Sequence, residues 1–162
     1  MTTASDLRDA ALDEFATVGY HAASIQAIAQ RAGVSKASVL YHFASKEALL
    51  DAALSPAIDE LESLIPRTLQ LGGADEERQD FLRAFVDFLL RHRRAAQVLI
   101  TQSGSLSTLP IVVRAQELMQ QIAHTRPESS VDDDVRFAVA LGGAAYLLSH
   151  LATCDEAEVP SD

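Results

Sequence analysis

Closely spaced helix-capping residues are the strongest constraint that the sequence places on the fold. Ser24, Ser35 and Ser45 can each accept a hydrogen bond from the first turn of a helix. Gly19 and Gly33 stand where the first and second helices should stop, because glycine is the favoured residue just beyond a helix end. The pattern therefore predicts helices over 4–18, 25–32 and 36–43, and a fourth helix that begins at position 46.

Helical patterns continue through the rest of the 162 residues, and no stretch shows the alternating pattern of a strand. Pro56 lies inside the fourth helix, which it should kink or divide because proline has no N–H to donate. Later helices are predicted over 75–92, 94–102 and 110–126, with a last one from about Asp132 to Cys154. The fold class that follows is all-α.

Two short helices that meet at a glycine form a helix-turn-helix pattern over 24–43. Ala29 is small where the two helices must approach closely, and Gly33 can take the positive φ that the turn requires. The expected small core consists of Ile25, Ile28, Val34 and Val39, with Leu40 as a further candidate. The side chains left to enter a major groove and meet base edges and phosphates are Lys36, Ala37, Ser38, Tyr41 and His42.

The distribution of charge changes what the net charge of −10 suggests. An acidic chain as a whole is a poor partner for nucleic acid. Positions 20–46, however, hold no Asp or Glu and include Arg31, Lys36 and Lys46, whereas the chain from Asp51 onward has 9 basic and 18 acidic residues. This asymmetry is typical of a nucleic-acid-binding end on an acidic body, although such a window can also lack acids by chance.

The stretch AIAQRAGVSKASVLYHFASKEALL resembles the N-terminal DNA-binding domain of the TetR family of transcriptional regulators. The resemblance covers about residues 6–52 and is carried by Ala32-Gly33-Val34-Ser35, Tyr41-His42-Phe43 and Ser45-Lys46-Glu47-Ala48-Leu49. It implies a homodimer that binds a palindromic duplex operator, usually as a repressor that a small-molecule effector releases. It also implies an N-terminal three-helix helix-turn-helix domain at 1–46 and a C-terminal helical ligand-binding and dimerisation domain at 47–162.

The resemblance also implies which residues contact DNA. Ser24 would cap the second helix and touch a phosphate, and Lys46 would contact a phosphate from the start of the fourth helix. On the recognition helix the implied contacts come from Ser35, Lys36, Ala37, Ser38, Tyr41 and His42. Leu40 departs from the family, in which many members carry an aromatic residue. Helix-turn-helix units also occur as packing modules, so a helical adaptor that binds no DNA is the alternative, with Tyr41 and His42 as core aromatics.

The last predicted helix carries two apolar stripes. The first contains only small residues: Ala138, Gly142, Ala145, Ser149 and Ala152. A helix that is apolar all round is buried on more than one side. We therefore expect the small stripe to form a symmetric dimer contact together with the helix over 110–126. The alternative is that both stripes are buried within one subunit.

A pocket for the effector is expected in the C-terminal domain, where apolar walls with a few polar groups are typical of such sites. The candidate lining residues are Phe85, Phe88, His92, Gln102, Met119 and Tyr146, each of which could instead be simple core. Arg91, Arg93 and Arg94 form a basic cluster that could hold an anion or be a solvated face.

Other classes of site find little support. Cys154 is the single cysteine, which excludes a disulfide framework and a Cys-based zinc site, and His92 and His124 lack acidic partners at helical spacing. No cofactor is expected, and no phosphate loop or nucleophile motif suggests an enzyme. Within the uncharged stretch 137–154 only 137–148 is continuously apolar, which is short for a membrane span. We expect a cytoplasmic protein.

Overall fold

The computed structural model describes residues 3–69 and 75–124, together with six residues of the segment 135–147. In these residues it contains seven helices and no strand, so the predicted all-α fold is confirmed. The helices are α1 (Ala4–Val18), α2 (Ile25–Arg31), α3 (Lys36–His42), α4 (Lys46–Leu69), α5 (Asp75–Arg91), α6 (Arg93–Gln102) and α7 (Pro110–His124).

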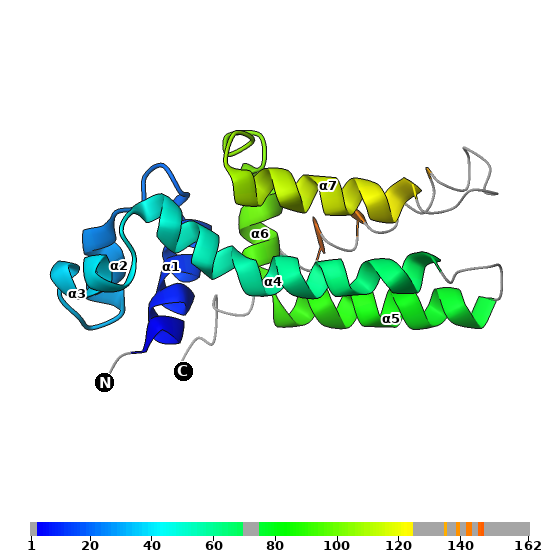
Figure 1. The fold of residues 1–162 in the computed structure, drawn as a ribbon, viewed down its shortest axis with the longest axis horizontal. Helices are drawn as coiled ribbons and strands as arrows, with labels where there is room; N and C mark the ends of the chain where they lie inside the picture. The colour runs from blue at the N-terminus through cyan, green and yellow to red at the C-terminus, as the bar shows by residue number, and fades with distance from the viewer. Residues whose placement is uncertain are drawn as a thin grey trace, which may run out of the picture.

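The helices α1, α2 and α3 gather at one end of the molecule around the first turns of α4 (Figure 1). Ser24 and Ser35 cap α2 and α3 as predicted, since each hydroxyl accepts a hydrogen bond of 3.1 Å from the backbone N–H three residues later. Gly19 and Gly33 both have positive φ, at 85° and 68°. The short helices therefore end where the sequence predicts, to within a residue.

Ile28, Ala29 and Val39 are fully buried and form the centre of the helix-turn-helix core, and Ile25 and Val34 pack against them. Leu40 is not part of that core, because 42% of its surface is exposed. The reason is helical geometry: Val39 points inward, so the next residue along a short helix is turned away by about 100°.

Pro56 does not divide α4, which continues as one helix from Lys46 to Leu69. Its ribbon bends part-way along, between the helix-turn-helix end and the stretch that runs beside α5 (Figure 1). Buried side chains on both sides of the proline, among them Leu54 and Ile58, hold the helix against its neighbours. Packing thus outweighs the one hydrogen bond that proline removes.

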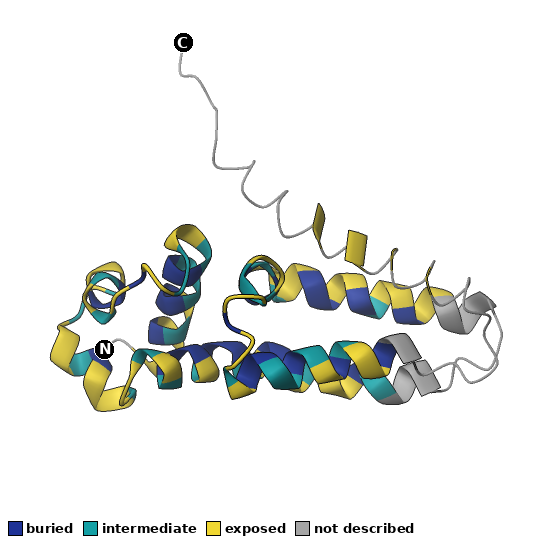
Figure 2. Cartoon of the chain, turned by 90° about the horizontal axis from the view of Figure 1, so that it is seen from above, coloured by how far each residue is buried: buried dark blue, intermediate teal, exposed yellow. Residues whose placement is uncertain are grey.

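The second half of the molecule consists of α4, α5 and α7, which run lengthwise, and α6, which crosses between α5 and α7 (Figure 1). Exposed residues lie along the outer faces of these helices (Figure 2). α1 packs against both α4 and α6, and a single apolar cluster extends from Leu7 in α1 to Ile122 in α7. The two halves therefore share one core, and a shift of α6 bears directly on α1. Within the described part of the chain, no helix is both long and apolar enough to span a membrane.

Candidate nucleic-acid interface and ligand cavity

The predicted contact residues of α3 lie together on its outer surface. Lys36, Ala37 and His42 are exposed, Ser38 is half-buried, and Tyr41 is 86% exposed. Tyr41 and His42 meet edge to face, with ring centroids 5.3 Å apart. The structure therefore excludes the alternative in which these two aromatics belong to the core.

Leu40 adds an exposed apolar side chain to this surface, which the sequence interpretation did not assign to the interface. An aliphatic side chain beside hydrogen-bond donors can contact the methyl group of thymine in a major groove. The signal that could have found it is its place directly after Val39, the buried residue of α3.

The basic side chains at positions 20–46 differ in the partners that they bind. Arg31 donates to the carboxylate of Glu14 from two of its nitrogens, at 3.0 and 3.3 Å, and this pair ties α2 to α1. Glu14 is almost fully buried, at 9% exposure. Lys36 forms no ion pair with any residue that the structure describes, so it is a cation of α3 that remains available to a DNA phosphate or base.

Lys46 lies at the start of α4, as predicted, but its ammonium group is engaged within the protein. Nζ donates to the backbone carbonyls of Tyr20 at 2.8 Å, Ala23 at 2.9 Å and His21 at 3.4 Å. It also lies 4.5 Å from the centre of the Tyr20 ring, a cation–π distance. A phosphate contact from Lys46 would have to share these protons.

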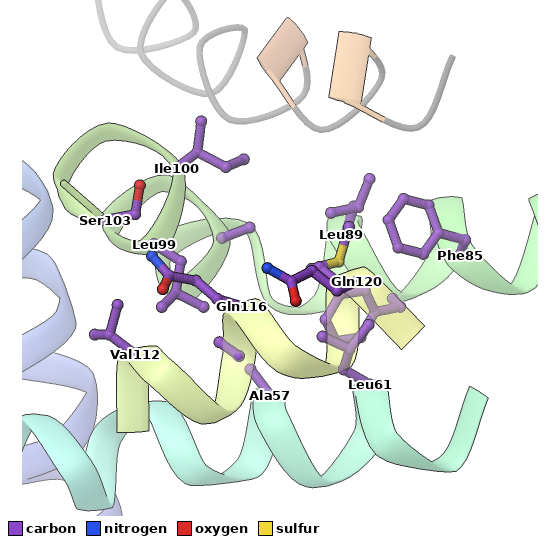
Figure 3. A pocket seen from close by; sticks show the side chains of 14 residues that line it. Ala57, Leu61, Phe85, Leu89, Leu99, Ile100, Ser103, Val112, Gln116 and Gln120 are labelled. Atoms are coloured by element: carbon purple, nitrogen blue, oxygen red, sulfur yellow. The ribbon is translucent and has the colours of Figure 1, made fainter. Parts of the chain in front are cut away.

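A cavity of about 400 Å³ lies between α4, α5, α6 and α7 (Figure 3). Phe85, Phe88 and Met119 line it, in agreement with the candidates from sequence. Its other walls are Ala57, Leu61, Leu89, Ala96, Leu99, Ile100, Val112 and Ala115, with Ser103, Gln116 and Gln120 as polar groups. No charged side chain lines this cavity among the described residues, so it suits an uncharged, largely apolar molecule.

The other three ligand candidates do not line this cavity. His92 Nε2 lies 2.8 Å from Glu60 Oε2, and Arg91 also pairs with that carboxylate. Gln102 points to α1 and the turn after it. Tyr146 is 55% exposed. Sequence reasoning could not separate these residues from Phe85 or Met119, because the partners of His92 and Gln102 lie far away along the chain.

Two arginines of the basic cluster are neutralised inside the chain, because Arg91 pairs with Glu60 and Arg94 with Asp13. The bonds from Arg91, followed by that from His92, hold the pKa of the Glu60 carboxyl below its usual value. The described residues contain no group of three His, Cys, Asp or Glu side chains that could hold a metal ion.

Of the predicted dimer stripe, only Gly142 is described; Ala138, Ala145, Ser149 and Ala152 lie outside the described residues. Gly142 is exposed, and a Cβ atom built on it would meet nothing within 4 Å. Four described apolar residues between positions 135 and 147 are exposed by 55–68%: Val135, Val139, Tyr146 and Leu147. These four side chains therefore present apolar surface away from the subunit.

Comparison with known proteins identifies the N-terminal part. Residues 7–53 match the family model described as bacterial regulatory proteins, tetR family. The HTH-type transcriptional regulator RutR of Escherichia coli K12 is 50% identical over 50 residues, which is 31% of this chain and 24% of that protein. The HTH-type transcriptional activator FasR of Mycolicibacterium smegmatis is 40% identical over 81 residues, 49% of this chain and 37% of that protein. The matched segments thus span a quarter to just over a third of these relatives.

Solved structures extend the likeness to the whole fold. A TetR-like transcriptional regulator from a Rhodococcus species has a TM-score of 0.67 and 26% identity, covering 93% of this chain and 84% of that one. The TetR family regulator PfmR from Thermus thermophilus has a TM-score of 0.69 over the full length of both chains, at 18% identity. The architecture of α4 to α7 is therefore shared with these proteins at low sequence identity.

Proposed function

We propose that this chain, which carries the N-terminal helix-turn-helix domain of the TetR family, is a transcriptional regulator that binds a roughly palindromic duplex as a homodimer. The observation that carries the proposal is the outer surface of α3. It presents Lys36 and the exposed Tyr41 and His42 from a segment without acidic residues. In an otherwise acidic protein, this is a surface that a DNA backbone can approach.

In this proposal α3 enters the major groove. Lys36, Ala37 and Ser38 lie on its first turn, where a short side chain or a lysine can reach base edges. Tyr41 and His42 follow one turn later and are placed to contact phosphates. Ser24 and Ser35, at the starts of α2 and α3, would add hydroxyl contacts to the backbone.

We propose a homodimer because one helix-turn-helix unit per chain reads only one half-site. The exposed apolar residues of 135–147 provide a surface that a second copy can cover. Gly142 on this surface leaves room for close approach of a helix. The remaining stripe residues Ala138, Ala145, Ser149 and Ala152 are proposed to continue the same contact.

The cavity is the proposed effector site, with Phe85, Phe88 and Met119 among its walls. An uncharged and largely apolar effector fits best, since a buried charge without a partner is costly. We propose that effector binding weakens DNA binding by favouring a different position of the recognition helices. The role is regulatory rather than enzymatic, as the names of the relatives suggest, and its place of action is the cytoplasm, where operator DNA is found.

Selection of bound duplexes from a random pool tests the proposal. A regulator should enrich one roughly palindromic sequence, and its affinity should fall with salt by about 0.9 log units per log unit for each phosphate neutralised. A helical adaptor, the alternative, should enrich no sequence even at low salt. Light scattering of the complex then distinguishes two copies per duplex from one.

A further inference from the structure

The side chain of Gln102 joins α6, a helix that lines the cavity, to the helix-turn-helix half. Gln102 is the last residue of α6, and its Nε2 donates to the carbonyl of Phe15 in α1 at 2.9 Å. Its Oε1 accepts from the backbone N–H of Tyr20 at 2.7 Å. The Gln102 amide thus donates to the last turn of α1 through its nitrogen, and accepts through its oxygen from the residue that begins the turn to α2.

The same turn is held from its other side by Lys46. Lys46 donates to the carbonyl of Tyr20, while Gln102 accepts from the N–H of that residue. The Tyr20 ring packs on Phe15, with centroids 5.4 Å apart, and lies under the Lys46 ammonium. Ser24, which caps α2, follows at the end of this turn. The position of the turn therefore sets where the helix-turn-helix begins.

The segment around Gln102 is also a wall of the cavity. Leu99, Ile100 and Ser103 all line it, so the residues shortly before and after Gln102 face the proposed effector (Figure 3). Apolar contacts between α1 and α6 tolerate small sliding, whereas hydrogen bonds weaken steeply as their distance and angle change. The amide of Gln102 is consequently more sensitive to a shift of α6 than the packing around it.

We propose that Gln102 is the positioning residue through which the contents of the cavity alter the position of the helix-turn-helix. Filling the cavity displaces the end of α6, and Gln102 then releases Phe15 and Tyr20. The turn between α1 and α2 then keeps its bonds to Lys46 and the ring contact between Tyr20 and Phe15, but loses its hydrogen bond to α6. This inference rests on the proposed function, but its first test needs no DNA.

Hydrogen exchange of the Tyr20 amide reports the contact directly, because that N–H is the donor to Gln102. Gln102→Met keeps the length of the side chain and removes both hydrogen bonds, so exchange at Tyr20 should rise roughly two- to ten-fold. The matched control is Gln97→Met, a glutamine of the same helix that does not line the cavity, which should leave the exchange of the Tyr20 amide unchanged. Unaltered exchange in Gln102→Met would overturn the proposal.

Coupling to the cavity is tested with Ala115→Leu, which fills part of the space from α7. Tyr20 exchange should rise in Ala115→Leu alone but show no further rise when Gln102→Met is already present. An equal rise in Tyr20 exchange in both backgrounds, or no rise in either, would overturn the proposal that Gln102 transmits the contents of the cavity to the turn. Ala57→Leu, which enters from α4, replaces Ala115→Leu if thermal melting shows that the latter does not fold.

With a selected duplex in hand, DNA affinity provides the second measurement. Ala115→Leu should weaken binding about ten-fold in the wild-type background, within the usual range of coupling, and much less in Gln102→Met. If no duplex is ever enriched, the proposed function fails, while Tyr20 exchange still decides whether Gln102 reports the contents of the cavity. An equal loss of DNA affinity in both backgrounds would overturn the role of Gln102 but would leave the proposed function as a DNA-binding regulator standing.

Discussion

At the scale of single residues, Glu60 shows how a bond between helices becomes a dependence on pH. Its carboxylate, on α4, accepts from Arg91 and lies 2.8 Å from His92 Nε2, and its pKa is lowered chiefly by Arg91. A carboxyl whose pKa is lower in the folded protein stabilises it above the unfolded pKa and loses that contribution as pH falls through the folded pKa. The contact between α4 and the end of α5 should therefore weaken in acid.

We predict that the free energy of unfolding falls between about pH 6 and about pH 3, and that Glu60→Gln has a smaller fall over the same interval. Urea unfolding at each pH measures both proteins. Asp59→Gln is the matched control, because Asp59 is an exposed neighbour that pairs with Arg114 instead. An identical pH profile for Glu60→Gln and the wild type would mean that this carboxylate contributes nothing to the pH dependence of the free energy of unfolding.

Two lysines of the DNA-binding end are predicted to differ in what they do. Lys36→Ala should cost about 1–3 kcal/mol on the selected operator and flatten discrimination at one base pair of each half-site, without lowering thermal stability. Lys46→Ala should lower thermal stability, because three carbonyls lose a donor, and should weaken operator and scrambled duplexes by similar factors.

Affinities of both variants on both duplexes, at several salt concentrations, make the comparison. A drop of about one unit per subunit in the salt slope of Lys46→Ala, with stability unchanged, would show that its ammonium serves a phosphate and not the turn. A change of sequence preference in Lys46→Ala but not in Lys36→Ala would reverse the assignment.

At the scale of the element, α3 is a helix of only seven residues, so its start depends on its cap. The hydroxyl of Ser35 accepts from the N–H of Ser38 at 3.1 Å. Ser35→Ala should cost about 0.5–2 kcal/mol of stability. Ser35→Asp should restore the cap, since aspartate is an equally good capping residue, and yet place a negative charge where a phosphate is proposed to lie.

Ser35→Asp is therefore expected to unfold like the wild type but to bind DNA far more weakly. Ser35→Ala should lose part of its stability and part of its DNA affinity. Urea titrations and duplex binding at fixed salt separate the two properties. Full DNA affinity in the aspartate variant would place the start of α3 away from the phosphates.

At the scale of the whole molecule, the exposed apolar residues between positions 135 and 147 should decide the state of assembly. Gly142 has open space around its Cβ position within the subunit. Gly142→Leu should therefore leave the subunit folded and overpack the dimer contact, where overpacking costs about 1–3 kcal/mol at each of two related sites. Light scattering should show monomers at concentrations at which the wild type is dimeric.

Circular dichroism of the same samples checks that helix content is retained. Gly104→Leu serves as the control, because Gly104 also has nothing within 4 Å of its Cβ position but lies in the loop before α7. An equally stable dimer of the Gly142 variant would place this glycine outside the interface.

The sequence alone determined the features that depend on neighbours in the chain. Helix starts at Ser24 and Ser35 and stops at Gly19 and Gly33 follow from hydrogen bonds and backbone angles within a few residues, so these predictions were confirmed. The same holds for the all-α class and for the resemblance over 6–52, which agrees with the matched range 7–53. Of the six cavity candidates chosen from the sequence, Phe85, Phe88 and Met119 line the cavity.

Tertiary structure alone decided which distant group each polar side chain meets. Helical periodicity tells which residues of a helix face inward, but not which residues of another helix lie opposite. Gln102 was therefore predicted to line the cavity, although its amide bonds to Phe15 and Tyr20, more than eighty positions earlier. The ammonium of Lys46 likewise reaches carbonyls of a turn formed by the chain between α1 and α2. Such partners become neighbours only when α4 and α6 pack on α1. Burial of apolar area drives this packing, and because it is not directional, the apolar pattern of the sequence does not specify which polar groups meet.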